Sequence, residues 1–304
     1  MWSMPYKSRA ESAELQILRI LNFRMDLSDK ERQHFFNLKK GYKGEVMLDA
    51  STEKLQCDCY ILNDLWFKQN NTTFQIDSLI ITSGTIYFFE IKNFEGDYYY
   101  ESDRFYKNPK TEITNPLNQL GRSELLIRQL IQSLGFNIPI AASVVFINPE
   151  FTLYQAPLNK PIILPTQLNR YLNKLESIPS KLNGKHKILA DQLISKHIEE
   201  PLYNSVPSFD YDQLRKGIVC AKCSSFSILI IGKDCLCKNC NHKESVSTAV
   251  IRSVSEFKRL FPSRKITTNA IHEWCKVVNS KKTIRRILHK NFKTVSEHRW
   301  TFYE

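Results

Sequence analysis

Three side chains between Gln75 and Gly96 have types and a spacing that suit metal-dependent chemistry. They are Asp77, Glu90 and Lys92. Carboxylates are the ligands that a hard cation such as Mg²⁺ accepts in proteins, usually with water and phosphate completing its shell. An ammonium group beside them is placed to polarise a water or to stabilise the charge that develops on phosphorus during hydrolysis. The pattern alone is equally typical of charged residues at strand ends, so both interpretations stay open here.

A β-hairpin is expected to position these side chains. Two apolar runs, at residues 78–82 and 85–89, are separated by Ser83-Gly84, a pair typical of a tight turn. Because strand residues alternate between faces, Glu90 and Lys92 point to the same side, and the turn brings Asp77 beside Glu90. The three groups should therefore converge at one end of a sheet.

Apolar periodicity and turn residues predict further helices and strands around this hairpin. The predicted helices cover residues 12–24, 28–39, 45–55, 115–134 and 166–175, and the predicted strands cover 57–67, 98–101, 104–107, 140–147 and 161–164. A break at residues 41–44 would place Glu45 in a first helical turn, where a carboxylate interacts favourably with the helix dipole. Gln119 falls in the first turn of the helix that starts at Asn115-Pro116, from which its amide can reach the site. A surface glutamine is the alternative.

The order of four short motifs resembles the nuclease-related domain, NERD, of the PD-(D/E)xK nuclease superfamily. The motifs are Gly44-Glu45, Gln75-Ile76-Asp77, Glu90-Ile91-Lys92-Asn93 with Gly96, and Asn115-Pro116-Leu117 with Gln119. The resemblance covers roughly residues 42–175 and implies an α/β fold with a restriction-endonuclease-like mixed sheet flanked by helices.

The same resemblance implies a role for each site residue. Asp77 and Glu90 would bind Mg²⁺ or Mn²⁺, and Lys92 would assist the attacking water. The remaining catalytic candidates, Glu45 and Gln119, would support the site. The chain departs from the superfamily pattern at Ile76, which stands where proline is expected before the aspartate.

Four cysteines form a second group with metal-ligand spacing. Cys220 and Cys223 make one C-x2-C pair, Cys237 and Cys240 make another, and thirteen residues separate the pairs. This spacing resembles a zinc ribbon, in which four thiolates hold one structural Zn²⁺ and replace a core that so short a segment cannot build. Cys235 and His242 are left outside this ligand set, and a redox-active dithiol is the alternative.

The last part of the chain is predicted to be a small winged helix-turn-helix-like domain. A capping box at Ser253 and Glu256 should open a helix that ends at Phe261. Thr267 or Thr268 should cap a second helix and Ser280 a third. Strands at 292–295 and 299–303, with a turn at 296–298, would form the wing.

The third helix of this domain carries a dense set of cations. Its apolar stripe is formed by Ile284, Ile287 and Leu288, and its remaining surface carries Lys281, Lys282, Arg285, Arg286 and Lys290. Such a helix can lie in a DNA major groove with its cations on phosphates and base edges. The alternative is a protein-binding helical cap with a solvated basic face.

Charge is distributed unevenly along the 304 residues. Residues 211–304 contain 19 Lys and Arg against 7 Asp and Glu, whereas residues 1–210 contain 24 of each, so the last part carries the whole net charge of +12. A neutral catalytic part joined to a basic docking part is typical of an enzyme that acts on nucleic acid.

Length and motif positions predict five segments. These are a helical lead-in at 1–41, a NERD-like domain at 42–175, a helical linker at 176–215, a zinc ribbon at 216–250 and the winged-helix-like domain at 251–304. No apolar run is long enough to cross a bilayer and residues 1–9 lack an apolar signal core, so a cytoplasmic protein without membrane contact is expected.

The combined motifs predict a metal-dependent endonuclease or nickase that hydrolyses DNA, with double-stranded DNA as the expected partner. A homo-oligomer, or a protein of defence or repair, is a further partner considered. The competing prediction is a non-catalytic DNA-binding regulator or scaffold that retains a nuclease fold. A third is a tail that makes only protein contacts, for which little salt-dependent DNA binding is expected.

Overall fold

A computed structural model describes residues 4–109, 111–199, 206–297 and 300–304. The chain forms two compact units. The first unit comprises residues 1–12 and 36–201, and the second comprises residues 13–35 and 202–304. Among the described residues, no helix combines the length and the apolar character needed to cross a membrane. The predicted division into five segments remains a prediction.

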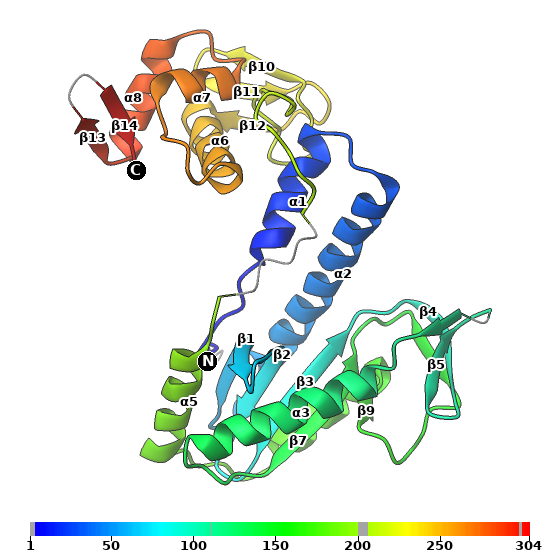
Figure 1. Ribbon diagram of the computed structural model, residues 1–304. Coiled ribbons are helices and arrows are strands. Elements are labelled where there is room, and N and C mark those ends of the chain that lie inside the picture. The colour runs from blue at the N-terminus through cyan, green and yellow to red at the C-terminus, as the bar shows by residue number, and fades with distance from the viewer. Residues whose placement is uncertain (1–3, 110, 200–205, 298–299) are drawn as a thin grey trace. The chain divides into compact units, whose positions relative to one another are not determined.

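A five-stranded mixed sheet organises the first unit (Figure 1). Its strands are β1 (Tyr60–Gln69), β2 (Thr72–Ile81), β3 (Ile86–Lys92), β7 (Ile140–Phe146) and β9 (Ile162–Ile163), in the order β1-β2-β3-β7-β9. The pairs β1-β2 and β2-β3 are antiparallel, and β3, β7 and β9 run parallel. The predicted mixed sheet is therefore confirmed.

The predicted hairpin is formed by β2 and β3. Ser78 pairs with Phe89 and Ile81 with Ile86. The turn is closed by the Thr82 amide, which donates to the Thr85 carbonyl at 3.0 Å. The apolar residues of both strands are buried, which fixes the register because a slip by one residue would expose them.

Helices cover both faces of this sheet (Figure 1). On one face lie α3 (Pro116–Ser133) and α5 (Gly184–Lys196), which share a core with Leu62 and Phe88. On the other lie α2 (Asp29–Thr52) and α4 (Pro165–Glu176), which share a core with Ile80 and Phe89. Alternate residues of one strand thus enter different cores, as the period of a strand requires.

A second, four-stranded sheet lies beyond the end of β3. Its strands are β4 (Gly96–Glu101), β5 (Arg104–Lys107), β6 (Thr111–Ile113) and β8 (Phe151–Tyr154), in the order β6-β5-β4-β8. The predictions for β4 and β5 are confirmed. The strands β6 and β8 are additional to those predicted; both are short and lack a long apolar run.

The predicted helix break at residues 41–44 is wrong. Helix α2 runs without interruption from Asp29 to Thr52, so Glu45 lies in its interior and not in a first turn. A glycine in a helix costs about 1 kcal/mol relative to alanine, which packing of the helix can offset. Gly44 is buried against the end of β3, and this packing accounts for the continuity of the helix.

The second unit contains a three-stranded sheet and a group of three helices followed by a two-stranded sheet. The first sheet is formed by β10 (Ile228–Ile231), β11 (Asp234–Cys237) and β12 (Lys243–Ser245). The helices are α6 (Val246–Leu260), α7 (Thr268–Cys275) and α8 (Lys281–Asn291), and the last strands are β13 (Thr294–Glu297) and β14 (Trp300–Tyr303). This order agrees with the predicted winged helix-turn-helix-like arrangement.

Two details of the predicted tail are wrong. Helix α6 starts after Ser245, whose hydroxyl accepts from the Thr248 amide at 3.0 Å, so the predicted cap Ser253 lies inside the helix. The Ser253 hydroxyl instead donates to the Ala249 carbonyl at 2.8 Å. The predicted turn at 296–298 begins too early because β13 continues to Glu297. Residue 298, the last of the predicted turn, and residue 299, the first of the predicted strand 299–303, lie outside the described residues. The predicted caps Thr267 and Ser280 are confirmed.

Helix α1 (Ala13–Arg24) belongs to the core of this second unit. The Arg24 guanidinium lies 4.1 Å from the centre of the Trp274 ring and 2.5 Å from a carboxylate oxygen of Glu256. It also donates to the Arg215 carbonyl at 2.7 Å. This buried cation ties a segment near the start of the chain to helices close to its end.

Candidate functional site

The end of β3 presents Glu90 and Lys92 on one face, as their spacing predicts. The Lys92 ammonium donates to the Glu90 Oε1 at 2.7 Å and to the Gln119 Oε1 at 3.0 Å. The Glu90 side chain is 2% exposed and that of Lys92 is 20% exposed, so the carboxylate is enclosed while the ammonium remains open to a ligand. Asn115 caps α3 through the Leu117 amide and thereby sets the first turn that carries Gln119.

The Asp77 carboxylate completes this group from β2. The pairing of β2 with β3 ends at Ser78 and Phe89. Beyond this pair, the Oδ2 atom of Asp77, the residue next to Ser78, accepts a hydrogen bond from the Ile91 amide at 2.8 Å. A side chain thus takes the backbone donor where the ladder stops, which holds the buried carboxylate at the end of the hairpin.

Arg9, which no motif or periodicity in the sequence marks, joins these strands to helix α2. Its guanidinium contacts Glu45 at 2.8 Å and the two carboxylate oxygens of Asp49 at 2.8 and 3.0 Å. It also donates to the Asp77 backbone carbonyl at 2.7 Å. With 3% of its side chain exposed, Arg9 fixes the position of Glu45 beside the strand that carries Asp77.

An irregularity in β1 makes the Asp77 carbonyl available to Arg9. The ladder between β1 and β2 pairs Asn63 with Ser78 and Leu65 with Ile76, but it skips the position between them. Asp64 occupies that position with a φ of 54°, a left-handed conformation that Asp adopts more readily than most residues. The sequence signal of this feature is an acidic residue in the middle of a mostly apolar strand.

Gly44 and Asn93 have a structural role in the site. A Cβ atom on Gly44 would lie 2.6 Å from the Asn93 Cβ, closer than two carbons can approach. The Asn93 side chain also donates to the Lys40 carbonyl at 2.6 Å. The glycine therefore permits the close approach of α2 to the end of β3, which places Glu45 near Asp77.

Burial and mutual repulsion disfavour the charged forms of these carboxyl groups. Desolvation, with the charge of Asp77, raises the pKa of Glu90 to about 7 although Lys92 opposes the shift. Desolvation and Asp77 likewise raise the pKa of Glu45 to about 8, against the effect of Arg9. Burial also raises the pKa of Asp77. A cation placed among these groups would relieve the repulsion.

One buried carboxylate oxygen is suited to coordinate such a cation. The Glu90 Oε2 has no hydrogen-bond partner among the described residues, although its other oxygen is bonded to Lys92. A buried carboxylate oxygen without a partner is costly, and coordination of a metal would satisfy it. Asp77 and Glu90 therefore fit the oxygen ligands that Mg²⁺ or Mn²⁺ uses.

The four predicted cysteines come together in the second unit. The Sγ atoms of Cys220, Cys223, Cys237 and Cys240 all lie within 4.8 Å of one another. Cys220 and Cys240 are 3.6 Å apart, and Cys223 and Cys237 are 3.5 Å apart. Four sulfurs about 2.3 Å from one zinc at tetrahedral angles would be separated by about 3.8 Å, so the cluster fits a zinc ribbon.

The remaining cysteine of β11 is separate from this cluster. Cys235 is 1% exposed and packs in the core of the second unit, where burial raises its pKa to about 11. Desolvation acts in the same direction at Cys237, but donation from the backbone amides of Cys240 and Asn239 outweighs it and lowers the pKa to about 7. Two cysteines on one strand thus differ in their readiness to act as thiolates.

Helix α8 presents its predicted cations to solvent. Ile284, Ile287 and Leu288 are buried. The exposed residues include all five cations predicted to contact nucleic acid, namely Lys281, Lys282, Arg285, Arg286 and Lys290. The helix therefore combines an inward apolar stripe with an outward basic surface.

Comparison with protein families identifies one match. The model of NERD, the nuclease-related domain, matches residues 40–147. This segment starts within α2, ends directly after β7 and contains Glu45, Asp77, Glu90, Lys92 and Gln119. Comparisons with curated proteins and with solved structures gave no match.

Proposed function

We propose, from the premise that residues 40–147 form a nuclease-related domain, that the chain is a metal-dependent endonuclease or nickase acting on DNA. The observation that carries the proposal is the unpartnered, buried Glu90 Oε2 beside Asp77 and Lys92. A metal ligand and an ammonium group at one strand end are what phosphodiester hydrolysis of the PD-(D/E)xK type needs.

Asp77 and Glu90 would hold Mg²⁺ or Mn²⁺. The cation, when bound, would supply the charge that polarises the phosphate and activates the attacking water. The chain itself contributes two carboxylates held from neighbouring strands, one by the Ile91 amide and the other by Lys92. Their burial excludes bulk water and strengthens the interaction with a divalent ion.

Lys92 would act on the water and on the phosphate. An ammonium group has three N–H donors, and Glu90 and Gln119 accept two of them. The third is available to orient the attacking water or to stabilise negative charge on a phosphate oxygen. Gln119 would hold the ammonium in place, and this is the supporting role proposed for it.

Arg9 and Glu45 would set the charge around the metal ligands. Arg9 compensates the carboxylates of Glu45 and Asp49 and is anchored to the Asp77 backbone. Asp77 and Glu90 are then the carboxylates left for the divalent ion. Arg9 is thus a positioning residue, because it acts through Asp77 and Glu45.

The second unit would dock the substrate. Its exposed cations on α8 would contact DNA phosphates, and a zinc ion held by the four cysteines would stabilise the ribbon next to them. We propose double-stranded DNA as the substrate, since a helix with a basic outer face fits a major groove.

Cleavage of plasmid DNA tests this proposal. The purified chain is incubated with supercoiled plasmid and Mg²⁺ or Mn²⁺, in parallel with Glu90→Ala and Lys92→Ala. We expect nicked or linear product from the intact chain alone. If the intact chain cleaves no more than the variants yet binds the plasmid, the competing function is correct, that of a non-catalytic DNA-binding regulator or scaffold.

A further inference from the structure

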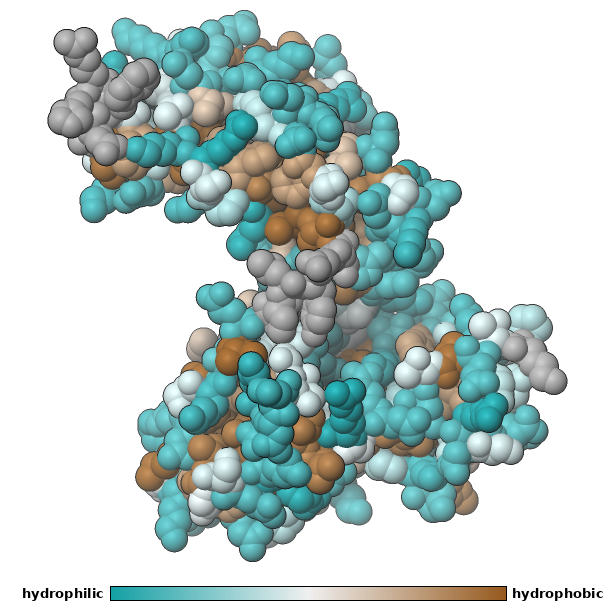
Figure 2. Space-filling model, viewed as in Figure 1, coloured by the Kyte–Doolittle hydropathy of each residue, from teal (hydrophilic) through white to brown (hydrophobic). Residues whose placement is uncertain are grey.

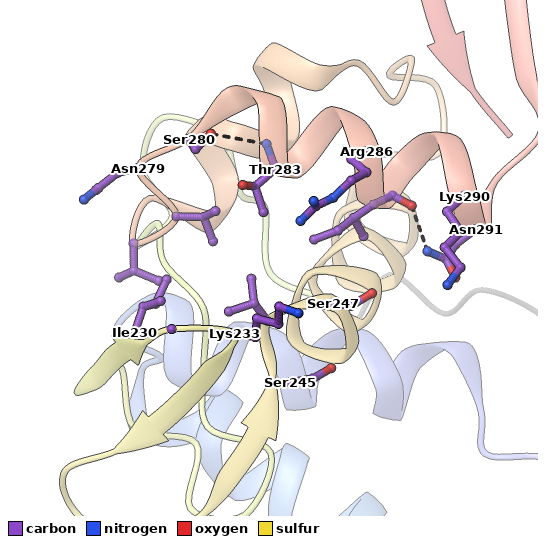
Figure 3. A pocket seen from close by; sticks show the side chains of 15 residues that line it. Ile230, Lys233, Ser245, Ser247, Asn279, Ser280, Thr283, Arg286, Lys290 and Asn291 are labelled. Carbon is purple, nitrogen blue, oxygen red and sulfur yellow. Dashed lines mark hydrogen bonds between the residues drawn. The ribbon is translucent and has the colours of Figure 1, made fainter.

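The second unit contains a cavity of about 620 Å³ that lies apart from the zinc cluster (Figure 3). It is bounded by the turn between β10 and β11, the first turn of α6, the segment before α8 and one side of α8. Its volume is within the range of sites that bind small molecules, roughly 300 to 1,000 Å³.

The lining of this cavity combines an apolar surface with cations. The apolar part is formed by Ile230, Val246, Val277, Val278 and Ile287. The cations are Lys233, Arg286 and Lys290, and the described lining contains no carboxylate. Figure 3 shows the Arg286 side chain pointing from α8 into the cavity. A ligand that fits must therefore carry both an anionic group and an apolar face.

The cations of α8 divide into two sets around this cavity. Arg286 and Lys290 are four residues apart, on one face of the helix, and both line the cavity. Lys281, Lys282 and Arg285 do not line it. The ion pairs within residues 206–297 join Lys243 with Asp234 and Arg252 with Glu244 and Glu256, so the lining cations are available to a ligand.

We propose that this cavity binds an unpaired nucleotide, with its phosphate on Arg286, Lys290 and Lys233 and its base against the apolar surface. The inference rests on the proposed function, since it names the part of the nucleic acid that the second unit recognises. A duplex offers phosphates on a convex surface and keeps its bases stacked inside. An unpaired nucleotide presents a phosphate and an apolar base face together.

Polar groups along the cavity suit the edges of a base. They are Ser245, Ser247, Asn279, Ser280, Thr283 and Asn291. The Asn291 amide donates to the Ile287 carbonyl at 2.8 Å, and the Ser280 hydroxyl accepts from the Thr283 amide at 3.3 Å. Both groups keep hydrogen-bonding capacity for a ligand, because an amide and a hydroxyl can each form further bonds.

Fluorescence anisotropy with the full chain tests the proposal. One labelled probe is a duplex with a single-stranded overhang, and the other is a blunt duplex of the same total charge. Binding is measured without added divalent cation, so that no cleavage occurs, and without chelator, so that zinc is retained. Far-UV circular dichroism and zinc content show that each variant is folded.

Two pairs of variants distinguish binding in the cavity from nonspecific electrostatic attraction between DNA and the basic surface. Arg286→Ala with Lys290→Ala removes two lining cations, and Lys281→Ala with Arg285→Ala removes two cations with the same spacing outside the cavity. Ser247→Glu places a carboxylate in the lining, whereas Thr248→Glu places one on the next residue, where it completes a capping box with Ser245.

We expect the two cavity variants to weaken overhang binding about tenfold more than blunt-duplex binding. The two control variants should weaken both probes to the same extent. For overhang binding, the slope of the logarithm of the binding constant against the logarithm of the salt concentration should become less steep by about 0.7 for each phosphate contact that is lost. Equal losses for both probes in the cavity variants, or preferential overhang losses in the controls, would overturn the proposal.

Competition identifies the source of the nucleotide. Displacement of the overhang probe by a deoxynucleoside monophosphate, at concentrations where orthophosphate has no effect, supports a site that also accepts free nucleotides. Displacement by a short single strand alone supports a site for nucleic acid. Equal displacement by orthophosphate contradicts a role for the apolar surface. The inference can fail in this way while the chain still cleaves plasmid, so its outcome is independent of the cleavage assay.

Discussion

Replacement of Gly44 by alanine tests how closely helix α2 approaches the end of β3. The new Cβ would lie 2.6 Å from the Asn93 Cβ and 3.1 Å from a methyl carbon of Ile147. Carbon atoms in contact lie about 3.5 to 4.0 Å apart, so the helix must move by roughly 1 Å or Asn93 must be displaced. Either movement would shift Glu45, the next residue, relative to Asp77.

Gly41 in the same helix is the matched control. Its added Cβ would meet no atom within 4 Å, so Gly41→Ala should gain the helix propensity of alanine, about 1 kcal/mol. Gly44→Ala gains the same helix propensity but also overpacks the core, at a cost of about 1 to 3 kcal/mol. The two variants should therefore differ by about 1 to 3 kcal/mol in the free energy of unfolding.

Urea titration of both variants and the intact chain measures this difference, and plasmid cleavage reports on the site. We expect Gly41→Ala to be more stable than the intact chain and equally active, and Gly44→Ala to be less stable than Gly41→Ala and less active. If Gly44→Ala were as stable and as active as Gly41→Ala, the close approach would not position Glu45.

Three further predictions concern the buried charges and the cysteines. Arg9→Met leaves two carboxylates uncompensated and should lower the free energy of unfolding by about 3 to 5 kcal/mol in a urea titration. Arg104→Met breaks an exposed ion pair and should leave the free energy of unfolding nearly unchanged in the same titration. In the metal-free chain, Glu90 keeps a proton up to its folded pKa of about 7, while the unfolded chain releases it near 4.3, so stability should fall by roughly 3 kcal/mol from about pH 4.5 to 7. A titration series of Glu90→Gln should show a smaller fall, because Glu45 and Asp77, whose pKa values are also raised, still contribute to it. A slope equal to that of the intact chain would contradict the assignment to Glu90. Cys237→Ser should lose the bound zinc, about one ion per chain by elemental analysis, while Cys235→Ser on the same strand should retain it.

Local patterns predicted the parts of the fold that depend on neighbouring residues. Strand alternation placed Glu90 and Lys92 on one face, and the pair Ser83-Gly84 predicted the turn that returns Asp77 to them. The C-x2-C spacing predicted for the same reason that the two cysteines of each pair lie close together, since they are only three positions apart. In these cases a few adjacent residues determine the geometry.

Contacts between distant segments were not predictable in this way. Arg9 meets Asp49 and Asp77 across 40 and 68 residues, and no periodicity marks it. The glycines of α2 suggested a helix break because their intrinsic propensity is poor, but packing on β3 overrides that preference. Arg24 is a similar case, because its partners Arg215 and Glu256 lie about 200 residues further along the chain.

The most direct test of the central claim is a Mn²⁺ titration that follows binding and cleavage together. Binding is measured by electron paramagnetic resonance and cleavage by the conversion of supercoiled plasmid, for the intact chain, Glu90→Gln and the control Glu95→Gln. Glu95 is an exposed residue paired with Lys40. We predict that binding and cleavage saturate at the same Mn²⁺ concentration in the intact chain and in Glu95→Gln, and that Glu90→Gln loses both. Cleavage by Glu90→Gln at the rate of the intact chain would contradict the assignment of the site.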